Sequence, residues 1–189
     1  MDLGVLKNEE RRMNLIMFLF MTAIPIVAVI YVVLFNGGKA RDTIALVMTG
    51  VSILVRLLQK PLGRSAKYLY VSILPVIGAV TIVVGTPACF GAMVEAYFLV
   101  LFLSVPYYDL SVIKACAAAT LITNIGAMIL FPSAYFAMYA LSIWIFIWMV
   151  YTLAIIVAVF IVCRARTLFA DVEKKENEVE GMLENVRTA

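Results

Sequence analysis

The chain has 189 residues, of which 65% are hydrophobic and 14% are charged, and its net charge is +3. Soluble domains carry roughly 45–50% apolar and about 25% charged residues, and a small globule lacks the interior to bury such an excess. The composition therefore excludes an ordinary water-soluble domain, and the mean hydropathy of +1.04 predicts a chain embedded in lipid. The basic residues lie in separate short segments, which argues against a nucleic-acid-binding face.

Six apolar segments follow one another along the chain, and short polar or Gly- and Pro-containing connections separate them. A helix that crosses a bilayer core of about 30 Å needs about 20 apolar residues. The segments that meet or approach this length are 13–35, 43–58, 68–84, 88–105, 110–131 and one within 135–163. We therefore predict an all-α membrane protein, in which residues 13–163 form a six-transmembrane-helix bundle that acts as a sensor domain.

The basic residues of the connections indicate how the bundle is oriented. If residues 1–12 are cytoplasmic, the outer side carries only Lys39 and Arg41. The inner side then carries Lys7, Arg11, Arg12, Arg56, Lys60, Arg64, Lys67, Lys114, Arg164 and Arg166. Because Lys and Arg concentrate in cytoplasmic loops, we predict a multi-pass protein of a bacterial plasma membrane with both termini in the cytoplasm.

Residues 164–189 are strongly charged and follow the last apolar segment without a linker. Apolar residues recur here at the first and fourth positions of a seven-residue repeat. They are Val172, Val179 and Val186 at the first position and Leu168 and Met182 at the fourth, where Lys175 also falls. Branched residues at the first position favour a parallel two-stranded coiled coil. We predict a homodimeric cytoplasmic signalling helix, and an output domain beyond residue 189 because no capping residue closes the heptads.

Three residues in the apolar segments are weak candidates for ligand sensing. Glu95 is the only acidic residue well inside an apolar run, where a carboxylate is costly unless it is neutralised, paired or hydrated. Glu95 either belongs to a proton-linked site or contacts a small ligand, or it is protonated and forms a hydrogen bond to a neighbouring helix. Asn124 is either part of such a site or an interhelical hydrogen-bonding residue. Tyr97, in the aromatic stretch of the fourth segment, is the third candidate.

The sequence predicts no catalytic residue, metal site or cofactor. Histidine is absent, which removes the commonest general base and metal ligand. There is no Walker loop and no GxSxG motif. The cysteines Cys89, Cys116 and Cys163 lack CxxC spacing and are interpreted as small apolar residues. Asp109 follows Pro106-Tyr-Tyr108 at an inner turn and is predicted to cap the fifth helix.

The pattern resembles the membrane regions of six-span methyl-accepting chemotaxis proteins, and of histidine kinases and diguanylate cyclases with such regions. The matching segments are the basic start 7–12, the turn 85–87, the aromatic stretch 96–99, the inner segment 107–114, the pair 123–124 and the charged exit 166–180. The resemblance spans the whole chain and is one of pattern. It implies a dimeric receptor whose output domain couples to an adaptor and a kinase.

We therefore predict a non-enzymatic, transmembrane signal-transducing receptor region. It senses a ligand or a membrane state within the bundle and passes a packing change through the last helix to a cytoplasmic output. The alternative is a small six-span transporter or substrate-binding subunit, similar to the S components of energy-coupling-factor transporters, with Glu95 and Asn124 in its cavity. Reading the gene past residue 189 distinguishes the two: further helical sequence favours the receptor, and a stop codon favours the transporter.

Overall fold

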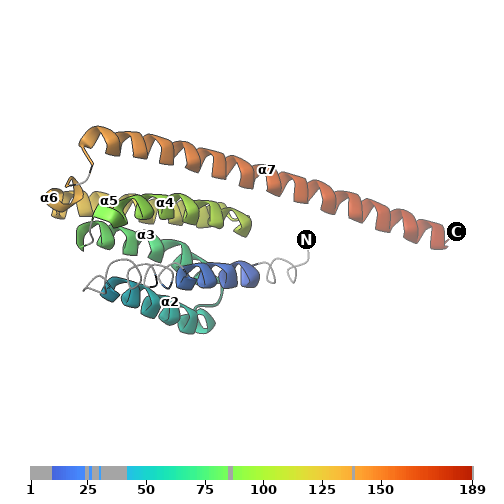
Figure 1. The fold of residues 1–189 in the computed structure, drawn as a ribbon. Helices are drawn as coiled ribbons and strands as arrows, with labels where there is room; N and C mark the ends of the chain where they lie inside the picture. The colour runs from blue at the N-terminus through green and yellow to red at the C-terminus, as the bar shows by residue number, and fades with distance from the viewer. Residues whose placement is uncertain are drawn as a thin grey trace.

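The computed structural model describes residues 10–23, 26, 30, 42–84, 87–137 and 139–188. These residues are almost entirely helical and include no strand, which confirms the all-α fold class. The long helices run side by side, and the last one extends well past the end of the others (Figure 1).

The helices begin and end close to the predicted boundaries. Residues 10–23 form the first described helix. The following elements are α2 (Asp42–Leu62), η1 (Gly63–Ser65), α3 (Ala66–Val84), α4 (Pro87–Ser104), η2 (Val105–Tyr107), α5 (Leu110–Leu130), α6 (Pro132–Tyr135) and α7 (Leu141–Thr188). The one-turn helix α6 is an addition to the prediction. The continuous helix predicted from the last apolar segment into the charged one is confirmed by the 48 residues of α7.

The turn between α4 and α5 has the predicted cap. Asp109 adopts an extended backbone conformation, and its side chain accepts a hydrogen bond from the Ser111 backbone N–H at 2.9 Å. This bond satisfies one of the N–H groups that an α-helix leaves without a partner at its start. Tyr108, just before it, has a φ of 51°, a left-handed conformation that is uncommon for a residue with a side chain. The chain therefore reverses sharply between Tyr107 and Leu110.

Helix α3 lies at the centre of the packing, against α2, α4 and α5, and α7 packs on α4, α5 and η2. The largest fully buried side chains include Tyr70, Leu101, Ile113, Trp144 and Tyr151. Residues from four long helices thus share one core. Much of the rest of each helix surface is exposed and apolar.

Two of the described helices are long and apolar enough to cross a membrane, namely Leu110–Leu130 and the portion Leu141–Leu183 of α7. Only 33% and 22% of their apolar windows are buried, whereas the core helix of a soluble protein would be mostly buried. These two helices suggest membrane association. Helices α3 and α4 contribute shorter apolar stretches, Ala66–Val80 and Val94–Tyr107, and the first predicted span lies partly outside the described residues.

Candidate functional site

The structure brings together two of the three candidate sensing residues. Tyr97 on α4 is 3% exposed and Asn124 on α5 is 1% exposed. The Tyr97 hydroxyl donates to Asn124 Oδ1 over 3.4 Å. Glu95, by contrast, is exposed on α4. Two residues along a helix differ in direction by about 200°, so Glu95 and Tyr97 cannot both face the interior.

Asn124 is the centre of a buried polar cluster. Its Oδ1 atom also accepts a hydrogen bond from the Tyr135 hydroxyl at 3.2 Å, and its Nδ2 donates to the Thr120 carbonyl at 2.8 Å. One side chain therefore connects α4, α5 and α6. A buried amide that makes these bonds avoids the cost of an unsatisfied polar group in an apolar surrounding.

Helix α7 joins the same cluster through Tyr151. The Tyr151 hydroxyl donates to Thr120 Oγ1 at 3.0 Å, and Thr120 Oγ1 donates in turn to the Cys116 carbonyl at 2.9 Å. Tyr135 stacks on Trp144 of α7, with ring centroids 4.3 Å apart. Asn124 is thus linked through Thr120 to the helix that leaves the bundle. We refer to Tyr97, Thr120, Asn124, Tyr135 and Tyr151 as the Asn124 cluster.

A glycine on α3 makes room for the cluster. A Cβ atom on Gly78 would lie 2.6 Å from Tyr97 Cε1 and 3.0 Å from its hydroxyl oxygen. Atoms in proteins do not approach this closely, so any larger residue at position 78 would displace the tyrosine ring. The close approach of the α3 backbone therefore helps to hold the Tyr97 hydroxyl near Asn124.

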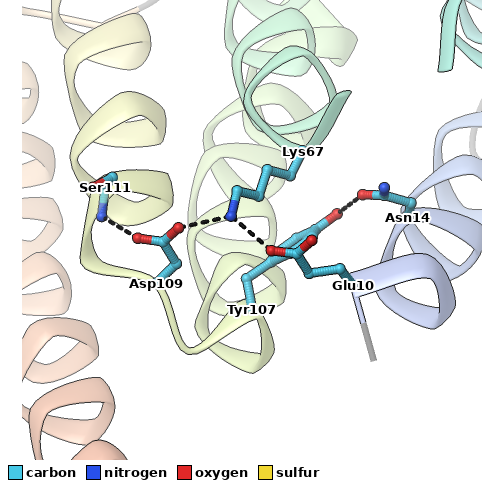
Figure 2. A network of polar contacts seen from close by, with 6 residues as sticks. All are labelled: Glu10, Asn14, Lys67, Tyr107, Asp109 and Ser111. Carbon is cyan, nitrogen blue, oxygen red and sulfur yellow. Dashed lines mark hydrogen bonds and ion pairs between the residues drawn. The ribbon is translucent and has the colours of Figure 1, made fainter. Parts of the chain in front are cut away.

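A second polar cluster lies at the opposite end of the bundle, where α7 leaves it (Figures 1 and 2). Lys67 is 8% exposed, and its Nζ lies 2.8 Å from Glu10 Oε1 and 2.8 Å from Asp109 Oδ2. The ammonium group points between the two carboxylates, as Figure 2 shows. Nearby, the Tyr107 hydroxyl donates to Asn14 Oδ1 at 2.7 Å. We refer to Glu10, Asn14, Lys67, Tyr107 and Asp109 as the Lys67 cluster.

Two members of the Lys67 cluster, Lys67 and Asp109, have pKa values shifted toward their charged forms. Burial lowers the pKa of Lys67, but the hydrogen bonds and charges of Asp109 and Glu10 outweigh it and raise that pKa overall. Burial likewise raises the pKa of Asp109, and the bonds from Lys67 and Ser111 outweigh it, so this pKa is lowered. Both shifts favour the charged forms that make the bridge.

A residue next to the Lys67 cluster contacts α7. Tyr108, which immediately precedes Asp109, places its ring edge-on to Phe169 of α7, with centroids 5.0 Å apart and an interplanar angle of 89°. The turn between α4 and α5 therefore contacts Lys67 through Asp109 and α7 through Tyr108. Sequence reasoning treated Lys67 only as a topology marker, because 57 and 42 residues separate it from its two partners.

The predicted coiled-coil residues lie on the part of α7 beyond the bundle. Leu168, Val172, Val179 and Met182 are all at least 50% exposed, and the side chain of Val186 lies outside the described residues. The surface is available for pairing with a second chain, which stays a prediction. In the described parts of the chain, no group of three or more His, Cys, Asp or Glu residues is placed to hold a metal ion.

The chain was also compared with known proteins. No protein-family model, no curated protein and no solved structure matches it. The resemblance of the sequence pattern to chemotaxis receptors therefore stays a prediction. A functional assignment has to rest on the geometry of the two clusters and of α7.

Proposed function

We propose that this chain is the multi-pass membrane region of a signal-transducing receptor of the chemotaxis type. In this proposal the bundle senses a ligand or a membrane state, and α7 transmits the change to a cytoplasmic output that acts on an adaptor and a kinase. The observation that carries it is the continuity of α7. One unbroken helix joins the Asn124 cluster through Tyr151, contacts Tyr108 beside the Lys67 cluster through Phe169, and continues into an exposed heptad.

The length of α7 supports this role. At 1.5 Å per residue its 48 residues span about 72 Å, whereas a bilayer core is about 30 Å thick. More than half of the helix therefore lies beyond one crossing. A helix that crosses once and continues as a charged rod can transmit a shift or a rotation as a rigid body.

The exposed apolar side chains support a bundle embedded in lipid. Leu57, Ile122 and Phe160 are 69%, 70% and 69% exposed, and they lie on α2, α5 and α7. Soluble monomers rarely leave such surface in water, since each fully exposed large side chain forfeits about 1.5–3 kcal/mol. Lipid removes this cost. Lys67 at the start of α3 and Arg164 on α7 lie at the exit end of the bundle, which supports cytoplasmic termini under the positive-inside rule.

The mechanism needs only a small difference in packing energy. Two arrangements of a bundle that differ by a few kcal/mol exchange populations when a ligand favours one of them. In the part of the chain that the structure describes, side-chain hydrogen bonds of the Asn124 cluster join α4, α5, α6 and α7. A ligand or bilayer change that rearranges these bonds would move Tyr151, and α7 with it. All steps are non-covalent, so the proposal assigns no enzymatic activity to the chain.

The test is disulfide cross-linking of α7 in cell membranes. Cys89, Cys116 and Cys163 are first replaced by Ala, and single cysteines are then introduced as Val172→Cys or Val179→Cys. Facing first heptad positions lie close together in a parallel coil, so both variants should form covalent dimers on mild oxidation. Lys174→Cys is the matched control, because this exposed position lies outside the seam.

The receptor proposal requires the heptad variants to cross-link several times faster than the Lys174→Cys control. Equal rates at all three positions, or none at all, would show that the extended part of α7 does not pair, and would contradict the proposal. A second measurement uses the receptor with its output region. Val172→Asp should abolish signalling while the amount of protein in the membrane stays unchanged.

A further inference from the structure

A pocket of about 630 Å³ opens beside the Lys67 cluster, between the first described helix and the end of α2. Its size is in the range of pockets that hold small ligands, about 300–1,000 Å³. Residues of three elements line it: Glu10, Arg11, Asn14, Arg56, Gln59, Lys60 and Gly63. We refer to it as the basic pocket, since Arg11, Arg56 and Lys60 supply three positive charges.

The basic pocket is positively charged in spite of Glu10. The Glu10 carboxylate accepts a hydrogen bond from Lys67 at 2.8 Å, and its one negative charge is outnumbered by the three cations of the pocket. Among the described residues, no carboxylate lies within ion-pair distance of Arg11, Arg56 or Lys60. Three cations that share an opening repel one another, and an anion between them would remove that repulsion.

The most buried of the three cations is held in place by neutral groups. Arg56 donates to Gln59 Oε1, and its Cζ lies over the Phe18 ring, 5.3 Å from the centroid. Gln59 Oε1 also accepts from the Tyr70 hydroxyl at 3.2 Å. The bond to Gln59 occupies one of the five N–H donors of the guanidinium group. A planar, positioned guanidinium of this kind suits two-pronged recognition of phosphate oxygens.

We propose that the basic pocket binds a phosphate group, carried either by an anionic lipid headgroup or by a soluble phosphate. Basic pockets between helices at the cytoplasmic surface of a membrane are suited to lipid phosphates, since the inner leaflet is anionic. Phosphate binding needs only the pocket and its charges, whereas a lipid source for the phosphate rests in addition on the proposed cytoplasmic orientation. It also links any bound phosphate to the Lys67 cluster, since Glu10 belongs to both.

The experiment uses the full chain in a neutral detergent, with native mass spectrometry to count bound molecules at a series of concentrations. The probes are dioctanoyl phosphatidylglycerol, the neutral dioctanoyl phosphatidylcholine, and inorganic phosphate. Saturable binding of one phosphatidylglycerol, in preference to phosphatidylcholine, identifies a lipid headgroup as the ligand. Saturable binding of inorganic phosphate, with no preference between the two lipids, identifies a soluble phosphate. Either result supports the proposed phosphate site, provided that substitution of the pocket cations weakens the binding.

Substitution of the pocket cations should weaken binding stepwise. Each cation contributes about a fivefold change in affinity, so Lys60→Gln should raise the dissociation constant about fivefold and Arg11→Gln with Lys60→Gln about 25-fold. Both positions are exposed, so the fold should tolerate these changes, as circular dichroism can verify. The control is Lys114→Gln with Arg164→Gln, which removes two exposed cations outside the pocket.

The control variant should bind as the wild type does. Two results would overturn the proposal. The first is the absence of saturable binding of both anionic probes, and the second is an equal loss of affinity in the pocket variant and the control, which would indicate diffuse attraction to the whole basic surface.

Discussion

The ring of Tyr108 lies edge-on against the ring of Phe169, with their centroids 5.0 Å apart. This contact joins the turn between α4 and α5 to the point where α7 leaves the bundle. Asp109, the next residue, binds Lys67 at 2.8 Å. The residue that contacts α7 is therefore adjacent to the ion pairs that join the first helix, α3 and the N-cap of α5. This end of the bundle is thus one connected structure.

Phe169→Ala should loosen α7 at the bundle exit. An aromatic pair contributes about 0.5–1.5 kcal/mol, so local opening should become about two- to tenfold more frequent. Trypsin cleavage at Arg164 and Arg166 in detergent should accelerate by the same factor. Phe160→Ala is the control, since Phe160 is a 69% exposed phenylalanine of the same helix. Equal cleavage of both variants would show that the Tyr108 contact does not restrain α7.

Lys67→Met should destabilise the bundle. Removal of the ammonium group leaves Glu10 and Asp109 without their partner, and their side chains are only 25% and 27% exposed. We expect a loss of about 1–3 kcal/mol, below the value for a fully buried pair. The control is Lys174→Met, because the Lys174–Glu178 pair is largely exposed and should contribute less than about 0.5 kcal/mol. Thermal unfolding in detergent gives both values, and similar losses would mean that the Lys67 cluster is solvated.

The Lys67 cluster should also shape the dependence of stability on pH. The pKa of Asp109 is lowered in the fold, so its contribution is present above its unfolded pKa of about 3.9 and is lost as the pH falls through the folded value. The pKa of Lys67 is raised, so its contribution is complete below about 10.4 and is lost as the pH rises through the folded value. Both pH dependences arise because a group whose pKa differs between the folded and unfolded states makes the free energy of unfolding depend on pH.

The unfolding midpoint of the wild type should therefore include a contribution from this cluster that is constant between about pH 4 and pH 10. Asp109→Asn retains a capping side chain. In this variant the unfolding midpoint should fall less as the pH is lowered below about 4. If the unfolding midpoints of the variant and the wild type fall equally at acid pH, other carboxylates determine the acid sensitivity.

Gly78→Ala should displace Tyr97. The added Cβ would lie 2.6 Å from the tyrosine ring, and relief of such overpacking costs about 1–3 kcal/mol. Gly126→Ala is a matched control on α5, because nothing lies within 4 Å of a Cβ there. That control should leave stability unchanged or raise it slightly, since Ala favours helix over Gly. If the two variants unfold at the same temperature, the ring does not occupy this position.

Asn124→Leu should remove the shared acceptor of two tyrosine hydroxyls. Interhelical hydrogen bonds in membranes contribute about 0.6 kcal/mol on average and up to about 1.7 kcal/mol, so the loss should be about 1–3 kcal/mol for the two bonds together. Glu95→Gln should change stability by less than about 0.5 kcal/mol, because Glu95 is exposed on α4. A larger effect of Glu95→Gln would place that side chain in a contact within the bundle or with a second chain.

Several features could be read directly from the sequence because they depend on neighbours along the chain. The starts and ends of α2, α3, α4 and α5 follow from apolar runs and from the Gly and Pro residues between them. The Asp109 cap depends on Ser111, two residues away. The continuity of α7 through Arg164 follows from the lack of proline. All of these are local properties of the backbone.

The sites, by contrast, depend on residues that are far apart in the chain. The sequence analysis named Glu95, Tyr97 and Asn124 as separate candidates from their polarity alone. The structure places Tyr97 beside Asn124 and leaves Glu95 exposed, because the two α4 residues face different directions. Their role in sensing stays a prediction. The helical repeat was the signal that separates the two. No sequence signal pairs Lys67 with Glu10 across 57 residues, since that contact depends on how α3 packs against the first helix.

By itself the sequence determined a helical chain, the position of most helix ends and a composition suited to lipid. Hydrophobic runs of set length and short-range hydrogen bonds specify these features without reference to the rest of the fold. Only the tertiary structure decided which polar groups meet. The Asn124 cluster, the Lys67 cluster and the basic pocket exist because helix packing places side chains from distant segments within a few ångströms. The direction of a side chain around its helix then decides whether it joins its neighbours or faces outward.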